Sequence, residues 1–141
     1  ASFKIITDLE RVADLAANLA EYTLSRTAML PDVGIPEIGW EAIDMLEAAL
    51  EAFEERDTEA CRTVAARDDD LDGLCEQASS QLVRNLIERD PIEATGNFET
   101  LLTDIESSLL TIRDLERIGD HAVNVAGRTL YVLDSDPELV Y

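Results

Sequence analysis

Apolar residues recur at helical spacing through almost the whole chain, and this period is the strongest constraint on its fold. It predicts helices over residues 3–29, 40–56, 57–89 and 97–133. No segment alternates apolar and polar residues with the period of two that a half-buried strand shows. The sequence therefore predicts an all-α fold, in which four helices with short connections form an antiparallel helix bundle.

Four apolar stripes should build the core of this bundle. On the first two helices they comprise Ile5, Leu9, Val12, Ala16, Leu19 and Thr23, then Trp40, Ile43, Leu46, Leu50 and Phe53. On the last two they comprise Ala60, Val64, Leu71, Cys75, Leu82 and Leu86, then Leu101, Leu102, Ile105, Leu109, Ile112, Leu115, Ile118, Ala122, Val125 and Leu130. On one predicted helix Cys61 and Cys75 would lie about 21 Å apart, too far for a disulfide.

A short acidic motif occurs twice. Asp8–Asp14 and Asp114–Asp120 share the pattern Asp-Leu-Glu-Arg-x-x-Asp and start 106 positions apart (114 minus 8). Only seven residues precede the first copy, so a repeat of that length is incomplete there. We expect a piece of a longer protein: residues 1–30 are the last helix of an incomplete first repeat, 31–39 a Pro- and Gly-containing linker, and 40–141 a complete second repeat.

Each copy of the motif pairs a glutamate with an aspartate four residues later, Glu10 with Asp14 and Glu116 with Asp120. Residues four apart lie one above the other on a helix, so one cation could bridge the two carboxylates. Such oxygen ligands favour iron, Mg, Mn or Ca. On a helical wheel the pairs lie away from the apolar side, which predicts a metal on the surface of the bundle.

A third pair, Asp68 with Asp72, lies in the run Arg67–Gly73. The run also resembles the start of a calcium-binding EF-hand, but Ser79 stands at the twelfth position, where that loop needs a glutamate. The helical period continues through the run, so we favour a helix. A plainer explanation of all three pairs is a solvated helix face, since the chain has 31 acidic residues.

His121 is the only histidine, and we expect it to pack beside the apolar side rather than to bind metal. One histidine cannot supply the repeated Glu-x-x-His motifs of a di-iron oxidase. The sequence contains no phosphate-binding glycine loop, zinc-protease motif or ordered Ser/His/Asp set. These residues offer binding rather than catalysis.

Charge narrows the range of partners. A net charge of -20 repels nucleic-acid phosphates and anionic lipid, so we expect neither as a direct partner. The single lysine, Lys4, beside 31 acidic residues is typical of salt-loving archaea, whose molar salt screens surface repulsion. Without a signal-peptide pattern or an apolar run of eighteen residues, we expect a cytoplasmic protein that does not insert into the membrane.

The segment Ile112–Ala126 closely resembles the signature helix of the PhoU family, the phosphate-uptake regulators. The first helix resembles the same signature in that family's first repeat, with Ala13 in place of the usual glycine. Residues 52–60 and Asp68–Asp72 resemble the first two helices of a PhoU repeat. The resemblance covers essentially the whole chain.

This resemblance implies a tandem of three-helix bundles, usually dimeric, that holds clusters of iron or other metals on its surface. The implied ligands are Glu10, Asp14, Asp68, Asp72, Glu116 and Asp120. It also implies a cytoplasmic regulator without catalysis, which negatively modulates the phosphate transporter and its signalling proteins. Because the first repeat lacks its own counterpart of Asp68 and Asp72, we expect metal mainly at the second repeat.

Two other functions stay open. The chain could be a helical dimerisation or interaction module, whose acidic rows keep it soluble and bind no metal. Clustered metals could also hydrolyse phosphoesters, although no base or substrate-positioning group is evident. The first helix, without its repeat partners, could pack on its own bundle or exchange with a second copy to form a homodimer.

Overall fold

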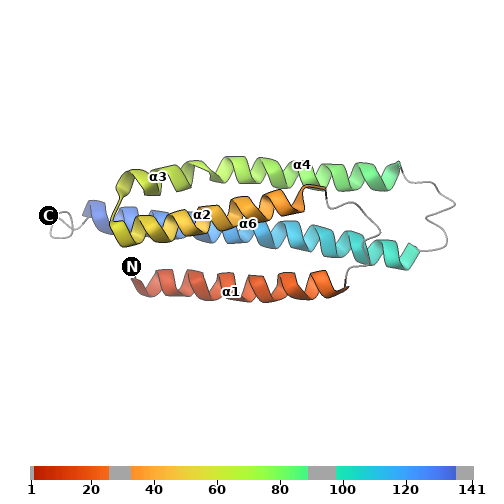
Figure 1. Ribbon diagram of the computed structural model, residues 1–141, viewed down its shortest axis with the longest axis horizontal. Coiled ribbons are helices and arrows are strands. Elements are labelled where there is room, and N and C mark those ends of the chain that lie inside the picture. The colour runs from red at the N-terminus through yellow and green to blue at the C-terminus, as the bar shows by residue number, and fades with distance from the viewer. Residues whose placement is uncertain (1, 26–32, 89–97, 136–141) are drawn as a thin grey trace.

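The computed structural model describes residues 2–25, 33–88 and 98–135 of the 141-residue chain (Figure 1). Its helices are α1 Ser2–Ser25, α2 Ile35–Glu55, α3 Thr58–Ala66, α4 Asp68–Ile87 and α6 Phe98–Ser135. These described ranges contain no strand, and none of their helices has the length and apolar character needed to cross a bilayer. The predicted all-α helix bundle is confirmed.

The long helix α6 is the centre of the bundle and contacts each of the other four described helices. Helix α2 lies along one side of α6. Helices α3 and α4 follow one another in a line, and each contacts both α2 and α6 (Figure 1). Helix α1 runs antiparallel to α6 and contacts α6 alone among the described helices. Of the two arrangements expected for the first helix, the structure shows packing on its own bundle, and exchange with a second copy stays a prediction.

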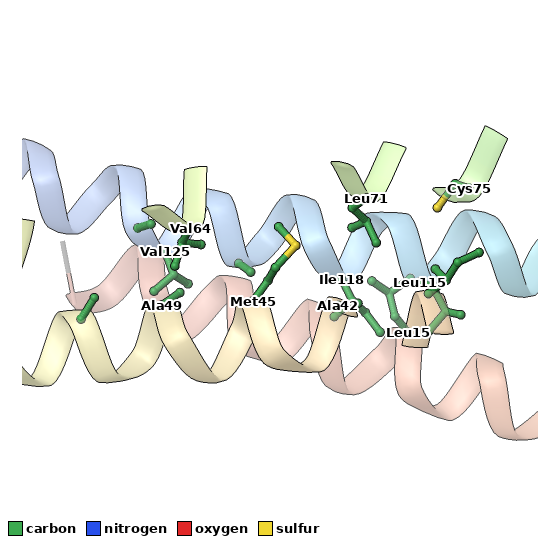
Figure 2. Packing of buried hydrophobic residues seen from close by; sticks show 14 of the residues in the cluster. Leu15, Ala42, Met45, Ala49, Val64, Leu71, Cys75, Leu115, Ile118 and Val125 are labelled. Carbon is green, nitrogen blue, oxygen red and sulfur yellow. The ribbon is translucent and has the colours of Figure 1, made fainter. Parts of the chain in front are cut away.

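The core lies where α2, α3 and α4 approach α6, and α1 adds Ile5 and Leu15 to it (Figure 2). A Cβ atom at Gly119 would overlap the side chain of Leu71 and would also meet Met45, so glycine is what lets these helices approach closely. Cys61 and Cys75 are buried in the same cluster, and both are free thiols, in agreement with the prediction that they form no disulfide.

Most of the predicted apolar stripe of α2 is wrong, since only Leu46 and Leu50 pack against the core. Trp40 is 68% exposed, and Ile43 and Phe53 are exposed as well. The buried residues of α2 are instead Ile38, Ala42, Met45, Ala49 and Ala52. Three alanines make a low surface on which another helix can approach closely, whereas the predicted stripe consists of large apolar residues.

The predicted stripe of α1 is rotated from the true buried side. Its member Ile5 is buried, but Ala16 and Thr23 face solvent, whereas Asp8 and Leu15 are buried although they are not part of the stripe. The buried side includes Asp8 because the carboxylate of this residue finds hydrogen-bond donors on α6. The other clearly exposed members of the predicted stripes are Leu102 and Leu109 on α6.

Two predicted helix boundaries are also wrong. The third helix is divided at Arg67, which ends α3 and precedes α4 with φ of -79° and ψ of -9°. Its Nε atom donates a hydrogen bond to Oε1 of Glu41 on α2 at 2.8 Å, and this contact holds the break against the bundle. Helix α2 begins at Ile35, inside the predicted linker 31–39, directly after Gly34 with a φ of 87° that favours glycine.

Candidate metal centre

Three acidic side chains meet between α4 and α6. Asp68 is the first residue of α4, Asp72 lies one turn further along it, and Asp120 faces them from α6. One carboxylate oxygen from each lies within 4.8 Å of the other two. Asp68 is half-buried and the other two are exposed, so the triad lies at the bundle surface.

The helix break at Arg67 places this triad. Because α3 ends there, α4 can begin at Asp68 and carry three consecutive aspartates, Asp68–Asp70, in its first turn. The positive end of the helix dipole favours carboxylates at this position. The ion pair between Arg67 and Glu41 fixes the start of α4 on the bundle, so the direction in which Asp68 and Asp72 face α6 is fixed too.

Repulsion dominates the electrostatics of the triad. Oδ1 of Asp68 is buried and receives no hydrogen bond from any residue that the structure describes. Burial, and then the charges of Asp72 and Asp120, raise the pKa of Asp68. Burial and Asp72 also raise the pKa of Asp120, against an opposing effect of His121. Carboxylates held in this way favour either a shared proton or a bound cation.

Glu116 extends the acidic row by one turn of α6. Burial and the charges of Asp72 and Asp120 raise its pKa. Burial and the neighbouring Glu116 raise the pKa of the Cys75 thiol to about 12. Asp72, Cys75 and Glu116 line a surface hollow of about 540 Å³. Because the thiol stays protonated at neutral pH, this hollow offers carboxylate oxygens rather than a thiolate.

The pair Glu10 and Asp14 lies apart from this group. Both side chains are exposed on α1, whose buried side faces α6. Within the described ranges, no third acidic, histidine or cysteine side chain joins them in a group that could hold an ion. Their role as ligands stays a prediction, as does the expectation that metal binds mainly at the second repeat.

The donor set fits a hard cation. The triad and Glu116 supply only carboxylate oxygens, which suit iron, Mg, Mn or Ca. Two of the triad residues are exposed, so water could complete the coordination of an ion there. His121 contacts Asp8 on α1 instead of facing the triad, so the site resembles neither a zinc centre nor a buried di-iron centre.

Comparison with known proteins decides the family. Residues 35–129 match the family model described as the PhoU domain, and this segment contains the whole acidic group. The chain belongs to the PhoU family. The match confirms the resemblance of Ile112–Ala126 to the PhoU signature helix.

Curated relatives carry one common name. The chain is 32% identical over 141 residues to the "Phosphate-specific transport system accessory protein PhoU homolog" of Synechocystis sp., covering 98% of the chain and 58% of that relative. A relative of the same name from Burkholderia sp. is 37% identical over 136 residues, with 92% and 54% covered. Homolog 1 of Methanothermobacter thermautotrophicus is 30% identical over 142 residues, with 94% and 58% covered. The chain thus spans little more than half the length of these relatives, and no solved structure matches it.

The PhoU-family chain contains a second polar cluster, between α1 and α6, that the sequence reasoning missed. Asp8 is only 3% exposed, and Arg128 Nε donates a hydrogen bond to its Oδ2 atom at 2.9 Å. His121 Nδ1 lies 2.8 Å from Oδ1, and Asn124 Nδ2 donates to the same oxygen at 3.5 Å. Burial alone would raise the pKa of Asp8, but the bonds with His121 and Arg128 hold it below its ordinary value of 3.8.

The duplicated motif contained a signal for this cluster. Asp8 and Asp114 open the two copies, and both are buried at the α1–α6 interface. Asp8 contacts Arg128 and Asp114 lies beside Tyr22, and positions 22 and 128 are themselves 106 apart (128 minus 22). Burial and the Asp114 carboxylate raise the pKa of Tyr22. The leading aspartate of each PhoU motif thus serves helix packing, while the later Glu and Asp lie away from this interface.

Proposed function

We propose that the chain is part of a metal-binding helical regulator of phosphate uptake, which negatively modulates the phosphate transporter and its signalling proteins. PhoU membership and the names of the relatives, accessory proteins of a phosphate-specific transport system, support this role. In this proposal the protein acts in the cytoplasm as a homodimer and catalyses no reaction.

The acidic triad is the observation that supports metal binding. A face that only keeps a protein soluble lets its carboxylates spread into water, because crowding them is unfavourable. Here Asp68, Asp72 and Asp120 converge instead, and one oxygen of Asp68 is buried without a donor among the described residues. We propose iron as the ion, with Mg, Mn or Ca as alternatives. The proposed ligands at this site are Asp68, Asp72, Glu116 and Asp120. Glu10 and Asp14 are proposed as a separate ligand pair on α1.

Metal retention tests this part of the proposal. The purified chain is loaded with ferric iron or Mn, dialysed extensively and examined by elemental analysis. We expect the wild type to retain a stoichiometric amount of metal and Asp120→Asn to lose it. Asp134→Asn makes the same change at an exposed position of α6 and should retain the metal. A wild type that retains none would favour the interaction module without a metal.

Phosphate uptake by cells tests the regulatory part. Deleting the gene for the full-length protein should raise uptake when phosphate is plentiful, and restoring the wild-type gene should lower it again. A gene that carries Asp120→Asn should fail to restore control if regulation needs the metal. Unchanged uptake in the deletion strain would contradict the regulatory function whatever the metal result.

We also propose that the chain is adapted to high salt. The net charge of -20 favours unfolding through repulsion, and a Debye length of about 3 Å at molar salt screens that repulsion. Circular dichroism should show partial loss of helix on dialysis from molar KCl into dilute buffer, with recovery when the salt is returned. Equal helix content and unfolding temperature in both buffers would contradict this adaptation.

A further inference from the structure

A surface hollow of about 620 Å³ lies between the start of α1 and the last turns of α6. These two helix ends lie at the same end of the bundle (Figure 1). Lys4 lines the hollow from α1, and Asn124, Gly127, Arg128 and Tyr131 line it from α6 together with two valines. The hollow shares no lining residue with the acidic group between α4 and α6.

The chemistry of this hollow is opposite to that of most of the protein surface. Its described lining includes an ammonium group, a guanidinium group, an amide and a phenol, and no carboxylate. By contrast, Asp72, Glu76 and Glu116 line the hollow at the acidic row. In a chain with 31 acidic and 11 basic residues, Lys4 and Arg128 gather here, and although Arg128 pairs with Asp8 behind the hollow, the lining itself presents donors to an anion.

A buried carboxylate behind the hollow holds its donors in position. Asp8 accepts a hydrogen bond from Nε of Arg128 at 2.9 Å and a longer one from Asn124 at 3.5 Å. The side chain of Arg128 is still 34% exposed, so its guanidinium group is both anchored and open to a ligand. Donors fixed in this way lose little conformational entropy when an anion binds.

Gly127 leaves room for a ligand between these donors. A Cβ atom at Gly127 would meet no other atom within 4 Å, so packing among the described residues does not require a glycine here. The neighbouring lining residues Val123 and Val132 and the ring of Tyr131 add apolar surface. Ligand sites commonly combine apolar walls with a few positioned polar groups.

We propose that this hollow binds a small molecule that carries an oxyanion on an apolar or aromatic body. Lys4 and Arg128 hold the anion with charge-assisted hydrogen bonds, and Asn124 and Tyr131 contribute further donors. The valines and the tyrosine ring contact the apolar body. Phosphate and carboxylate share this chemistry. Because Asp8 offsets the charge of Arg128, Lys4 supplies the net positive charge, and a phosphate dianion should bind more tightly than a carboxylate since it offers more charge and more acceptor oxygens.

Calorimetric titration of the purified chain with phenyl phosphate, benzoate and inorganic phosphate tests the proposal. We expect saturable binding of phenyl phosphate that is stronger than that of the other two probes. Lys4→Glu should weaken it by at least about tenfold, because it replaces a charge-assisted donor with a repelling carboxylate. Arg11→Glu makes the same change at an exposed position of α1 outside the hollow and should leave binding unchanged.

A second pair of variants tests the location independently of charge. Gly127→Leu fills the open space and should abolish binding, while the helix gains a residue of higher propensity. Gly73→Leu is the matched control, since a Cβ atom there also meets nothing within 4 Å and lies outside this hollow. Absence of saturable binding by phenyl phosphate and benzoate would overturn the proposal, and so would undiminished binding in both Lys4→Glu and Gly127→Leu. Equal binding of inorganic phosphate and phenyl phosphate would overturn the role of the apolar walls.

Discussion

The two sides of α6 place carboxylates in opposite electrostatic environments. On the α1 side, Asp8 is nearly inaccessible but contacts His121, Asn124 and Arg128, and its pKa is lowered. On the α4 side, Asp68 is less buried but faces Asp72 and Asp120, and its pKa is raised. Burial alone does not distinguish them, since it raises both pKa values. The donors around Asp8 identify it as part of helix packing, whereas the convergence of three carboxylates with few donors supports our proposal that the triad binds a cation.

Removing the carboxylate of Asp8 should give the largest loss of stability. Asp8→Ala leaves Arg128 and His121 without their partner and should lower the free energy of unfolding by about 2–3 kcal/mol. Urea denaturation followed by circular dichroism measures this change. Asp14→Ala removes an exposed carboxylate from the same helix and should change stability by less than about 0.5 kcal/mol. Equal effects of the two substitutions would contradict the packing role of Asp8.

Adding a methyl group to α6 should separate its packed side from its open side. Gly119→Ala forces Leu71 to move and should destabilise the fold by about 1–2 kcal/mol. Gly127→Ala meets open space and should stabilise it by about 0.5–1 kcal/mol, because alanine favours the helix. Thermal unfolding of both variants under the same conditions measures the difference. Two changes of the same sign would contradict the close approach of α4 at Gly119.

Neutralising the triad should have an effect opposite in sign to that of Asp8→Ala. Without metal, Asp120→Asn removes a like charge from an exposed group and should stabilise the chain by about 0.5 kcal/mol. With excess metal, the wild type should gain stability and the variant should not. A variant that is destabilised without metal would contradict the repulsion among these carboxylates.

The pH dependence of stability should distinguish Asp8, on the α1 side of α6, from the acidic group on its α4 side. The raised pKa values of Asp68, Glu116 and Asp120 mean that the folded, metal-free chain takes up their protons before the unfolded chain does. Their contribution to stability therefore increases as the pH falls toward the ordinary values of 3.8 and 4.5. The stability from Asp8, with its lowered pKa, is lost only as the pH falls further, below 3.8.

A variant with Asp68→Asn, Glu116→Gln and Asp120→Asn should lack the first of these two changes. Its stability difference from the wild type, followed by denaturation across this pH range, reports the triad alone. With metal bound the trend should reverse, because protons then compete with the ion. A constant difference at every pH would contradict the raised pKa values.

Periodicity predicted the helices well because it depends on the average pattern of many residues. It failed where one small or polar residue decides the packing. The buried side of α2 depends on alanines such as Ala42 and Ala49, which contribute little to an apolar pattern. The buried side of α1 includes Asp8, which only tertiary hydrogen bonds with α6 make favourable.

The candidate site was predictable in its residues but only partly in its geometry. Spacing four apart predicted that Asp68 and Asp72 lie on one helix face, and the structure agrees. No local rule could predict that Asp120 joins them, because that depends on how α4 packs against α6 after the break at Arg67. Cys75 was not predicted to lie beside this row, although its spacing of seven and three positions from Asp68 and Asp72 puts it on the same helix face.

A crystal structure of the chain soaked with Mn or iron, with anomalous scattering recorded at the metal edge, tests the central claim most directly. We expect an anomalous peak between α4 and α6, with oxygens of Asp68, Asp72 and Asp120 at about 2.0–2.4 Å from the ion. Carboxylates that point apart into solvent, or that bind arginine with no ion between them, would contradict it.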